Sequence, residues 1–283
     1  MNPRQVTIIM VTRNRPVSLA ACLGRTRALL PAEVQIIVFD DASTEVDKVR
    51  TIIESHQNTI RLRSEILVGP GEGRNRCVQA AVTPWCFSMD DDCYLETIPD
   101  LSRWCEDRPE DRDIAVVGFR YCNLPGGDLA PAGEVPGAAT TILGGASLLR
   151  RSAMLRSGGY LGWLVFARED TELALRLLRL GYRIWYDPAV IIQHARSLEG
   201  RDWDWSSFYH VRNTFIINVI HGGGLTGVVV GLARALGWGL LHKDGNIRAT
   251  LQGVGAGLYL LPNCFRARRE LFGADRRAGG IGV

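Results

Sequence analysis

The stretches VTIIMVTRNRP at residues 6–16 and VQIIVFDDAST at residues 34–44 decide the fold class. In each, a short β-branched apolar run meets a polar segment, and a helical pattern follows. The first helix is expected at 16–30, and the second is expected to run from Thr44, as its N-cap, to about His56. The alternation continues through a strand at 60–68, a helix ending near Ala81 and a strand at 85–89. Short strands alternating with helices predict an α/β fold, a mostly parallel Rossmann-like sheet covered on both faces.

The rest of the chain alternates less regularly. We expect a helix at 97–107, strands at 114–119 and 140–149, a helix at 168–180, strands at 182–186 and 189–193, and helices beyond Ser206. The proline- and glycine-rich loop at 123–137 is long enough for a lid or a disordered insertion. Two domains follow from this pattern: a catalytic domain at 1–200 and a helical C-terminal region at 201–283.

Charge is distributed unevenly along the chain. The net charge of +3 is too small to indicate nucleic-acid binding, so no nucleic-acid partner is expected. From Ala195 onward there are 11 basic and six acidic residues, which fits either an anionic partner surface or a solvated rim. The seven cysteines form no CxxC pair and no metal-ligand spacing with histidine, which favours reduced thiols in a cytoplasmic protein. The first residues show no signal-peptide pattern.

An uncharged stretch between Arg212 and Arg234 raises the question of a membrane span. Polar residues and the triple glycine at 222–224 interrupt it, which is poor for a spanning helix. The pattern favours buried or membrane-surface helices. Peripheral contact with the inner face of a membrane and a homodimer interface are therefore both open interpretations of the C-terminal region.

Three consecutive carboxylates, Asp90, Asp91 and Asp92, follow the apolar strand at 85–89. Buried carboxylates are costly unless a positive charge neutralises them. Asp90 and Asp92 alternate and so point to one side of an extended segment, where both can face one cation. Mg²⁺ and Mn²⁺ prefer such oxygen ligands and often share them with phosphates. A turn with an N-cap is the competing interpretation.

Two further polar segments end strands of the same predicted sheet. Asp40 and Asp41 are placed to accept hydrogen bonds from a ribose or base, as acidic residues after strands do in nucleotide-binding sheets, although capping alone would explain one of them. The glycine-rich loop at 69–73 precedes Arg74 at a helix start, where a guanidinium can reach an anion or a base. A plain strand-to-helix turn is the alternative. The loop's spacing differs from the dinucleotide fingerprint, so a nicotinamide site is not expected.

Two candidate catalytic positions lie in the second half of the chain. Glu169 and Asp170 open a helix, where a carboxylate is either a general base held on a rigid element or a partner of the helix dipole. His194 ends the apolar run VIIQH, and a lone histidine there is either structural or a metal ligand.

Taken together, these segments resemble the family 2 glycosyltransferases with the GT-A fold over about residues 5–196. Each motif is weak alone, but their order and spacing are specific. The C-terminal YHVRNTF is also similar to a segment of bacterial rhamnosyltransferase-like members. The motifs, in chain order, are VTRNRP, FDDAST, GRNRCVQAA, SMDDDC, GGASLLRRSAM followed by SGGY, REDTELALRLLRLGYRIWYDP and VIIQH.

The resemblance implies a role for each matched residue. Asp90 and Asp92 match the DxD motif, with Asp92 the expected direct ligand of Mn²⁺ or Mg²⁺ and His194 a further metal ligand. Asp170 matches the catalytic base, and Glu169 is its companion. The residues implied in donor binding are Thr12, Arg13, Asp40, Asp41, Arg74, Asp90, Asp91, Gly144 and Gly145.

The implied reaction is inverting sugar transfer from a nucleoside-diphosphate sugar, UDP- or dTDP-linked, to an acceptor hydroxyl. The acceptor is expected to be a lipid-linked glycan or a small molecule. A catalytically silent nucleotide-sugar-binding module is one alternative. A sugar-nucleotide pyrophosphorylase is another, but VTRNRP lacks the glycine and lysine that those enzymes generally carry in their N-terminal loop.

Overall fold

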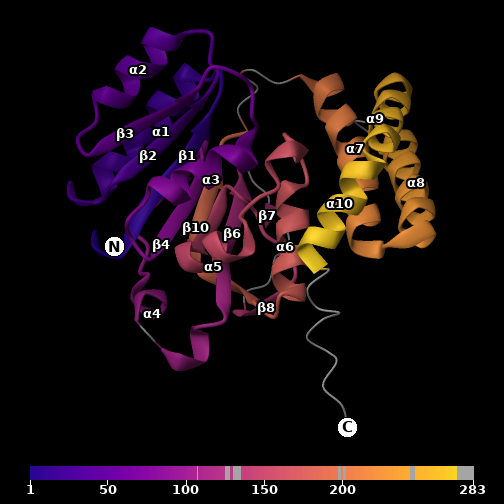
Figure 1. The fold of residues 1–283 in the computed structure, drawn as a ribbon. Coiled ribbons are helices and arrows are strands. Elements are labelled where there is room, and N and C mark those ends of the chain that lie inside the picture. Colours follow the sequence, from indigo (N-terminus) through magenta and orange to yellow (C-terminus); the bar gives the residue numbers. More distant parts are fainter. Residues whose placement is uncertain are drawn as a thin grey trace. The chain divides into compact units, whose positions relative to one another are not determined.

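Regular alternation of strand and helix builds the first half of the computed structural model (Figure 1). The structure describes residues 1–106, 108–124, 128–129, 135–196, 199, 202–242 and 246–272. The elements are β1 (Val6–Thr12), α1 (Pro16–Leu29), β2 (Ile36–Asp41), α2 (Val46–Glu54), β3 (Thr59–Ser64), α3 (Pro70–Ala80) and β4 (Trp85–Asp90). All seven expected elements are present, although β3 ends four residues earlier than predicted. The predicted N-cap of α2 is wrong, because Glu45 holds that position and the Thr44 hydroxyl donates to Asn14 Oδ1 (3.1 Å).

The second half departs further from the prediction. Its elements are β5 (Cys93–Leu95), α4 (Ser102–Cys105), η1 (Pro109–Asp111), β6 (Ile114–Asn123), β7 (Asp128–Leu129), β8 (Gly137–Ala139), β9 (Ala146–Arg150), α5 (Arg151–Ser157), η2 (Gly162–Leu164), α6 (Glu169–Arg179) and β10 (Arg183–His194). The helix expected at 97–107 shrinks to the single turn of α4. The two short strands expected at 182–186 and 189–193 are one strand, whose register shifts between Asp187 and Ile191. Pro188 lies at this irregularity, because proline cannot donate to a strand ladder. Most of the expected loop at 123–137 lies outside the described residues.

The strands form one mixed sheet in the order β3-β2-β1-β4-β9-β6-β10-β5. Its first four strands are parallel, as predicted, and β10 pairs in parallel with β6. The strand β9 runs antiparallel between β4 and β6. The carboxyl ends of β1, β2 and β4 therefore meet at one edge, where Thr12 pairs with Asp40 and Val11 pairs with Asp90.

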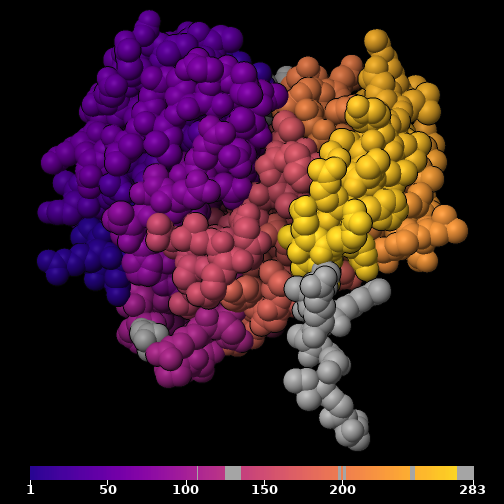
Figure 2. Space-filling model, in the orientation of Figure 1, coloured from indigo at the N-terminus to yellow at the C-terminus, as the bar shows by residue number. Residues whose placement is uncertain are grey.

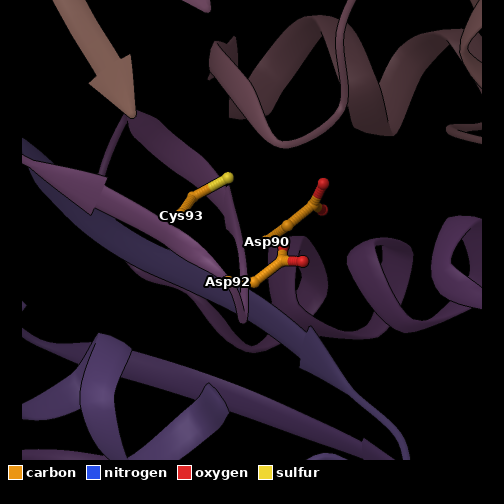
Figure 3. A group of neighbouring side chains, drawn as sticks. All are labelled: Asp90, Asp92 and Cys93. Carbon is orange, nitrogen blue, oxygen red and sulfur yellow. The ribbon is translucent and has the colours of Figure 1, made fainter. Parts of the chain in front are cut away.

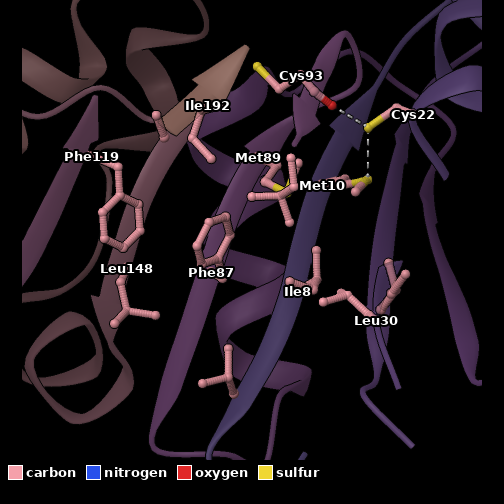
Figure 4. Packing of buried hydrophobic residues seen from close by; sticks show 14 of the residues in the cluster. Ile8, Met10, Cys22, Leu30, Phe87, Met89, Cys93, Phe119, Leu148 and Ile192 are labelled. Carbon is pink, nitrogen blue, oxygen red and sulfur yellow. Dashed lines mark hydrogen bonds between the residues drawn. The ribbon is translucent and has the colours of Figure 1, made fainter. Parts of the chain in front are cut away.

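Alternating side chains of the central strands supply two cores, one on each face of the sheet. On β1, Ile8 and Met10 belong to one buried cluster and Ile9 to the other, because successive residues of a strand point to opposite faces. The helices α1 and α2 pack on the first cluster, and α3, α5 and the later turns of α6 pack on the second. Figure 4 shows the first cluster, in which Cys22 Sγ lies 2.9 Å from the carbonyl oxygen of Cys93. All seven cysteines are free thiols.

The chain contacts group into two compact units. Unit 1 comprises residues 1–165 and 173–201, and unit 2 comprises 166–172 and 202–283. Unit 2 contains the four helices α7 (Trp203–Gly222), α8 (Gly224–Leu241), α9 (Ile247–Tyr259) and α10 (Leu261–Phe272), drawn in orange and yellow in Figures 1 and 2. Within the described residues, α8 alone is long and apolar enough to cross a membrane, and 22% of its window is buried.

Candidate active site

The side chain of Asp91 is buried and held by residues that follow or end β1. Thr12 Oγ1 donates to its carboxylate (2.7 Å), and Arg15 Nη1 pairs with the other oxygen (2.5 Å). Burial raises the pKa of Asp91 to about 7, although the charge of Arg15 and the hydrogen bond from Thr12 act in the opposite direction. Asp91 therefore links the ends of β1 and β4.

Asp90 and Asp92 lie close to each other, as their alternation predicts. One carboxylate oxygen of each and the sulfur of Cys93 lie within 4.8 Å of one another (Figure 3). Burial raises the pKa of the Cys93 thiol well above its ordinary value, which disfavours the thiolate. The two carboxylates are thus the natural ligands for a hard cation.

Two guanidinium groups neutralise these carboxylates. Arg74 Nη2 lies 2.7 Å from Asp90 Oδ1, and Arg15 Nη2 lies 2.6 Å from Asp92 Oδ2. Burial raises the pKa of Asp92, but the hydrogen bond from His194 and the charge of Arg15 outweigh it and lower the pKa to about 2. Asp92 is therefore ionised throughout the physiological range.

His194 lies beside Asp92, as the resemblance implies for a metal ligand. Its Nε2 lies 3.3 Å from Asp92 Oδ2, and its Nδ1 lies 2.8 Å from Asn123 Oδ1. The ring stacks on Tyr121 with centroids 4.9 Å apart. The contact between Nδ1 and the carboxamide oxygen fixes the ring with Nε2 facing Asp92, and a hydrogen bond on the other ring nitrogen is what orients metal-binding histidines.

Gly145 is packed directly against Asp90. A Cβ atom on this glycine would lie 2.2 Å from Asp90 Oδ2. Its neighbour Gly144 accepts a hydrogen bond from the buried Ser88 hydroxyl through its carbonyl oxygen. Both predicted glycines therefore lie beside the carboxylate cluster, and Gly145 lets the chain pass close to Asp90.

Asp40 and Asp41 are both engaged within the protein. Asp40 Oδ2 accepts from Arg61 (2.6 Å) and Arg63 (2.7 Å), and its side chain is fully buried. Burial raises the pKa of Asp40, but the hydrogen bonds from Arg61, Ser43 and Arg63 lower it overall. In this state Asp40 offers no exposed oxygen to a ribose.

Asp41 holds the start of the glycine-rich loop. Its two oxygens accept from the backbone NH groups of Val68 (2.8 Å) and Gly69 (2.9 Å). Gly69 has a φ of +89°, and a Cβ atom there would lie 1.6 Å from the carbonyl oxygen of Val165, so only glycine fits. Asp41 thus caps this loop, as the alternative interpretation of the sequence allowed, and its donor-binding role stays a prediction. Arg13, in contrast, is exposed beside this edge.

The SGGY motif is clamped from two sides. Asn75 of α3 accepts from the NH of Tyr160 (2.8 Å) and donates to its carbonyl oxygen (2.9 Å). The fully buried Arg176 donates to the carbonyl oxygens of Ser157 and Gly159. The GRNR and ELALR motifs therefore each contribute a polar side chain that fixes this turn, the half-buried Asn75 and the fully buried Arg176.

Glu169 and Asp170 begin α6 and belong to unit 2. The backbone before them is strained, since Ala167 and Arg168 have φ values of +61° and +64°. The fully buried Asn213 of α7 donates its Nδ2 to the carbonyl oxygens of Phe166 (2.6 Å) and Ala167 (2.7 Å).

The side chain of Arg168 donates in turn to Thr214 Oγ1 (2.8 Å). The YHVRNTF segment, which carries Asn213 and Thr214, thus fixes the loop that presents the predicted base. The sequence suggested only a family likeness for this segment.

The segments that form the site also match known proteins. The family model described as "Glycosyl transferase family 2" matches residues 7–157. A pre-mycofactocin glycosyltransferase of Mycobacterium tuberculosis is 23% identical over 259 residues, which cover 84% of this chain and 53% of that protein. The chain therefore spans about half the length of the curated relatives it matches.

Solved structures show the same fold at low sequence identity. The crystal structure of GalNAc-T7 with UDP, GalNAc and Mn²⁺ has a TM-score of 0.61 at 14% identity, over 98% of this chain and 58% of that one. The mannosyltransferase PcManGT from Pyrobaculum calidifontis, with GDP-Man and Mn²⁺, has a TM-score of 0.54 at 17% identity, over 99% and 77%. S. aureus TarS with UDP-GlcNAc has a TM-score of 0.57 at 16% identity, over 97% and 92%. The expected GT-A fold is confirmed.

Proposed function

Because this chain belongs to glycosyl transferase family 2, we propose that it transfers a sugar from a nucleoside-diphosphate sugar to an acceptor hydroxyl with inversion at the anomeric carbon. The observation that carries the proposal is the cluster of Asp90, Asp92 and His194 at the carboxyl ends of the strands, where ligands bind in such sheets. The nucleotides and sugars in the titles of the similar structures support a donor of this class. UDP- and dTDP-linked sugars are the donors we propose first.

The residues of the cluster fit a divalent cation. Two ionisable carboxylates and an oriented imidazole face one another, and hard cations prefer such oxygen-rich sets. Asp92 and Asp90 would hold the ion, with His194 as a further ligand. A bound Mn²⁺ or Mg²⁺ would stabilise the negative charge that develops on the leaving nucleoside diphosphate.

The arginines beside the cluster have a second role in this proposal. Arg15 and Arg74 now occupy the carboxylates. With a cation on Asp90 and Asp92, Arg74 and the Nη2 group of Arg15 would be available to bind diphosphate oxygens, while Nη1 of Arg15 would keep its ion pair with Asp91. Their positions would then complete the donor site on the nucleotide side, next to Thr12.

Asp170 would act as the general base, with Glu169 beside it at the start of α6. Its carboxylate would accept the proton of the acceptor hydroxyl while that oxygen attacks the anomeric carbon opposite the diphosphate. The acceptor that we propose is a hydroxyl of a lipid-linked glycan or of a small molecule.

A turnover assay separates this function from its alternatives. Incubating the chain with Mn²⁺ and a panel of nucleotide sugars should release nucleoside diphosphate, with sugar appearing on water or on an added acceptor. Release of pyrophosphate instead would indicate a pyrophosphorylase. Tight donor binding by calorimetry without turnover on any acceptor tested would indicate a silent binding module.

Asn213→Ala is expected to lower kcat by about tenfold and to leave the KM for the donor unchanged. The substitution removes both hydrogen bonds that Asn213 Nδ2 donates to the loop before Asp170. A barrier raised by about 1.4 kcal/mol through misplacement of the base corresponds to a tenfold lower rate. The control is Asn218→Ala on the same helix, because Asn218 donates to the helix carbonyl of Thr214 and not to this loop. Equal kcat values for the two variants would show that Asn213 does not position the base.

A further inference from the structure

The outward face of α8 and α9 is apolar, and the inward face is built from the smallest residues. On α8 the buried positions recur every fourth residue, as Gly227, Gly231, Ala235 and Gly239. On α9 the buried set contains Gly253 and Gly257 together with Ala249 and Thr250. A helix packed against a water-soluble core normally shows the opposite polarity, with its large apolar residues inward.

Backbone contacts explain why the inward positions are small. A Cβ atom on Gly227 would lie 2.8 Å from the carbonyl oxygen of Asn218 on α7. A Cβ atom on Gly253 would lie 2.8 Å from the carbonyl oxygen of Phe208, also on α7. The helices thus pack backbone to backbone, as helices do in lipid, and their large apolar side chains are left outside.

Exposed large apolar side chains recur along both helices. Leu241 is 87% exposed and Leu251 is 62% exposed. Single exposed apolar side chains are common on soluble proteins, but this many on two neighbouring helices indicate a contact surface. We define the outer apolar face as Leu225, Val229, Leu236, Leu240 and Leu241 of α8 with Ile247, Leu251, Leu258 and Tyr259 of α9.

The charges of α8, α9 and the following α10 are almost all positive. Within the described residues 224–242 and 246–272, the acidic side chain is Glu270, against five arginines. Arg268 points inward and donates to the carbonyl oxygen of Ile220, whereas the other four are exposed. The exposed arginines are Arg234, Arg248, Arg266 and Arg269.

We propose that the outer apolar face docks on the surface of a membrane that contains anionic lipids. Apolar side chains would enter the boundary of the acyl chains, and the exposed guanidiniums would pair with phosphate or carboxylate headgroups. In this proposal the helices lie along the surface. The 13 residues of α9 extend about 20 Å, short of a hydrocarbon core of about 30 Å. The helix α8 is long enough to cross but carries Arg234 within it, and a charged side chain is costly inside the hydrocarbon core. A second copy of this chain is a poorer occupant, because a two-fold interface would bring arginines toward arginines.

Vesicle flotation of the full chain tests the proposal. The chain should float with vesicles of phosphatidylcholine and phosphatidylglycerol, and raising the salt concentration should weaken that binding because headgroup attraction is screened. The double variant Leu241→Glu/Leu251→Glu should reduce the bound fraction at least tenfold, since it places two carboxylates at the membrane boundary. The matched control is Ile66→Glu/Val82→Glu, which changes side chains that are 72% and 84% exposed on unit 1.

Each other outcome overturns the proposal. Absence of flotation with anionic vesicles would do so, and so would equal flotation of the two double variants. If light scattering showed a dimer that Leu241→Glu/Leu251→Glu converts to a monomer, with no vesicle binding, the face would be an interface between copies. These outcomes do not depend on sugar transfer, so they leave the proposed function untouched.

Discussion

Asp170→Asn should lower turnover by about 10²–10⁴-fold and leave donor affinity near that of the unmodified chain. The amide keeps the size and planar shape of the carboxylate but is not basic enough to accept the proton of the acceptor hydroxyl. Donor affinity should persist because the proposed donor contacts are made by the carboxylate cluster and its arginines, and Asp170 is not among them. Single-turnover rates with donor and acceptor at saturation measure the chemical step, and calorimetry measures the donor affinity.

The competing explanation of Asp170 is a favourable charge at a helix N-terminus. Asp47 offers a matched control, because it is an exposed acidic residue in the first turn of α2. A dipole interaction of this kind is worth about 0.3–1 kcal/mol of stability and nothing in turnover. If Asp170→Asn resembled Asp47→Asn, with a small loss of thermal stability and near-normal rates, Asp170 would not be the base.

The parallel half of the fold could be predicted because its signal is local. Each of the strands β1, β2 and β4 is a short apolar run that ends at a polar segment, and burial on both faces requires such a run. Strand direction has no comparable local signal. The antiparallel course of β9, the short β5 and the single irregular β10 depend on pairing with distant partners.

The site shows the same division between local and long-range information. The alternation of Asp90 and Asp92 is local, and the structure brings the pair together as expected. The partners of the carboxylates were not predicted, because Arg15 lies more than 70 residues from Asp91 in the sequence. Arg61 and Arg63, which pair with Asp40, lie on the neighbouring strand β3. Nothing in the local sequence of that strand predicted their pairing with Asp40.

The loop before Glu169 and Asp170 had no readable signal either. Its positive φ values belong to Ala167 and Arg168, and neither residue type is typical of a left-handed backbone. Only the packing of α7 shows why the loop holds this shape.

Asp92→Ala should abolish the part of donor binding that depends on a divalent cation. Asp92 has a pKa of about 2 and is therefore ionised. It contacts both His194 Nε2 (3.3 Å) and Arg15 Nη2 (2.6 Å). Its removal leaves Asp90 and His194 without the ligand between them. Titrating a nucleoside-diphosphate sugar into the variant with Mn²⁺ and then with EDTA should give the same weak affinity in both, whereas the unmodified chain should bind more tightly with Mn²⁺.

Asp91→Asn is the control that makes this result specific to the cation. Thr12 and Arg15 hold the Asp91 side chain, which does not belong to the group of possible metal ligands formed by Asp90, Asp92 and Cys93. Its pKa of about 7 means that the neutral form is already accessible near physiological pH. An amide reproduces that neutral form in the same buried space, so Asp91→Asn should keep the difference between Mn²⁺ and EDTA. If Asp91→Asn lost the difference between Mn²⁺ and EDTA while Asp92→Ala kept it, Asp91 and not Asp92 would be the cation ligand. The prediction from the alternation of Asp90 and Asp92 would then be wrong.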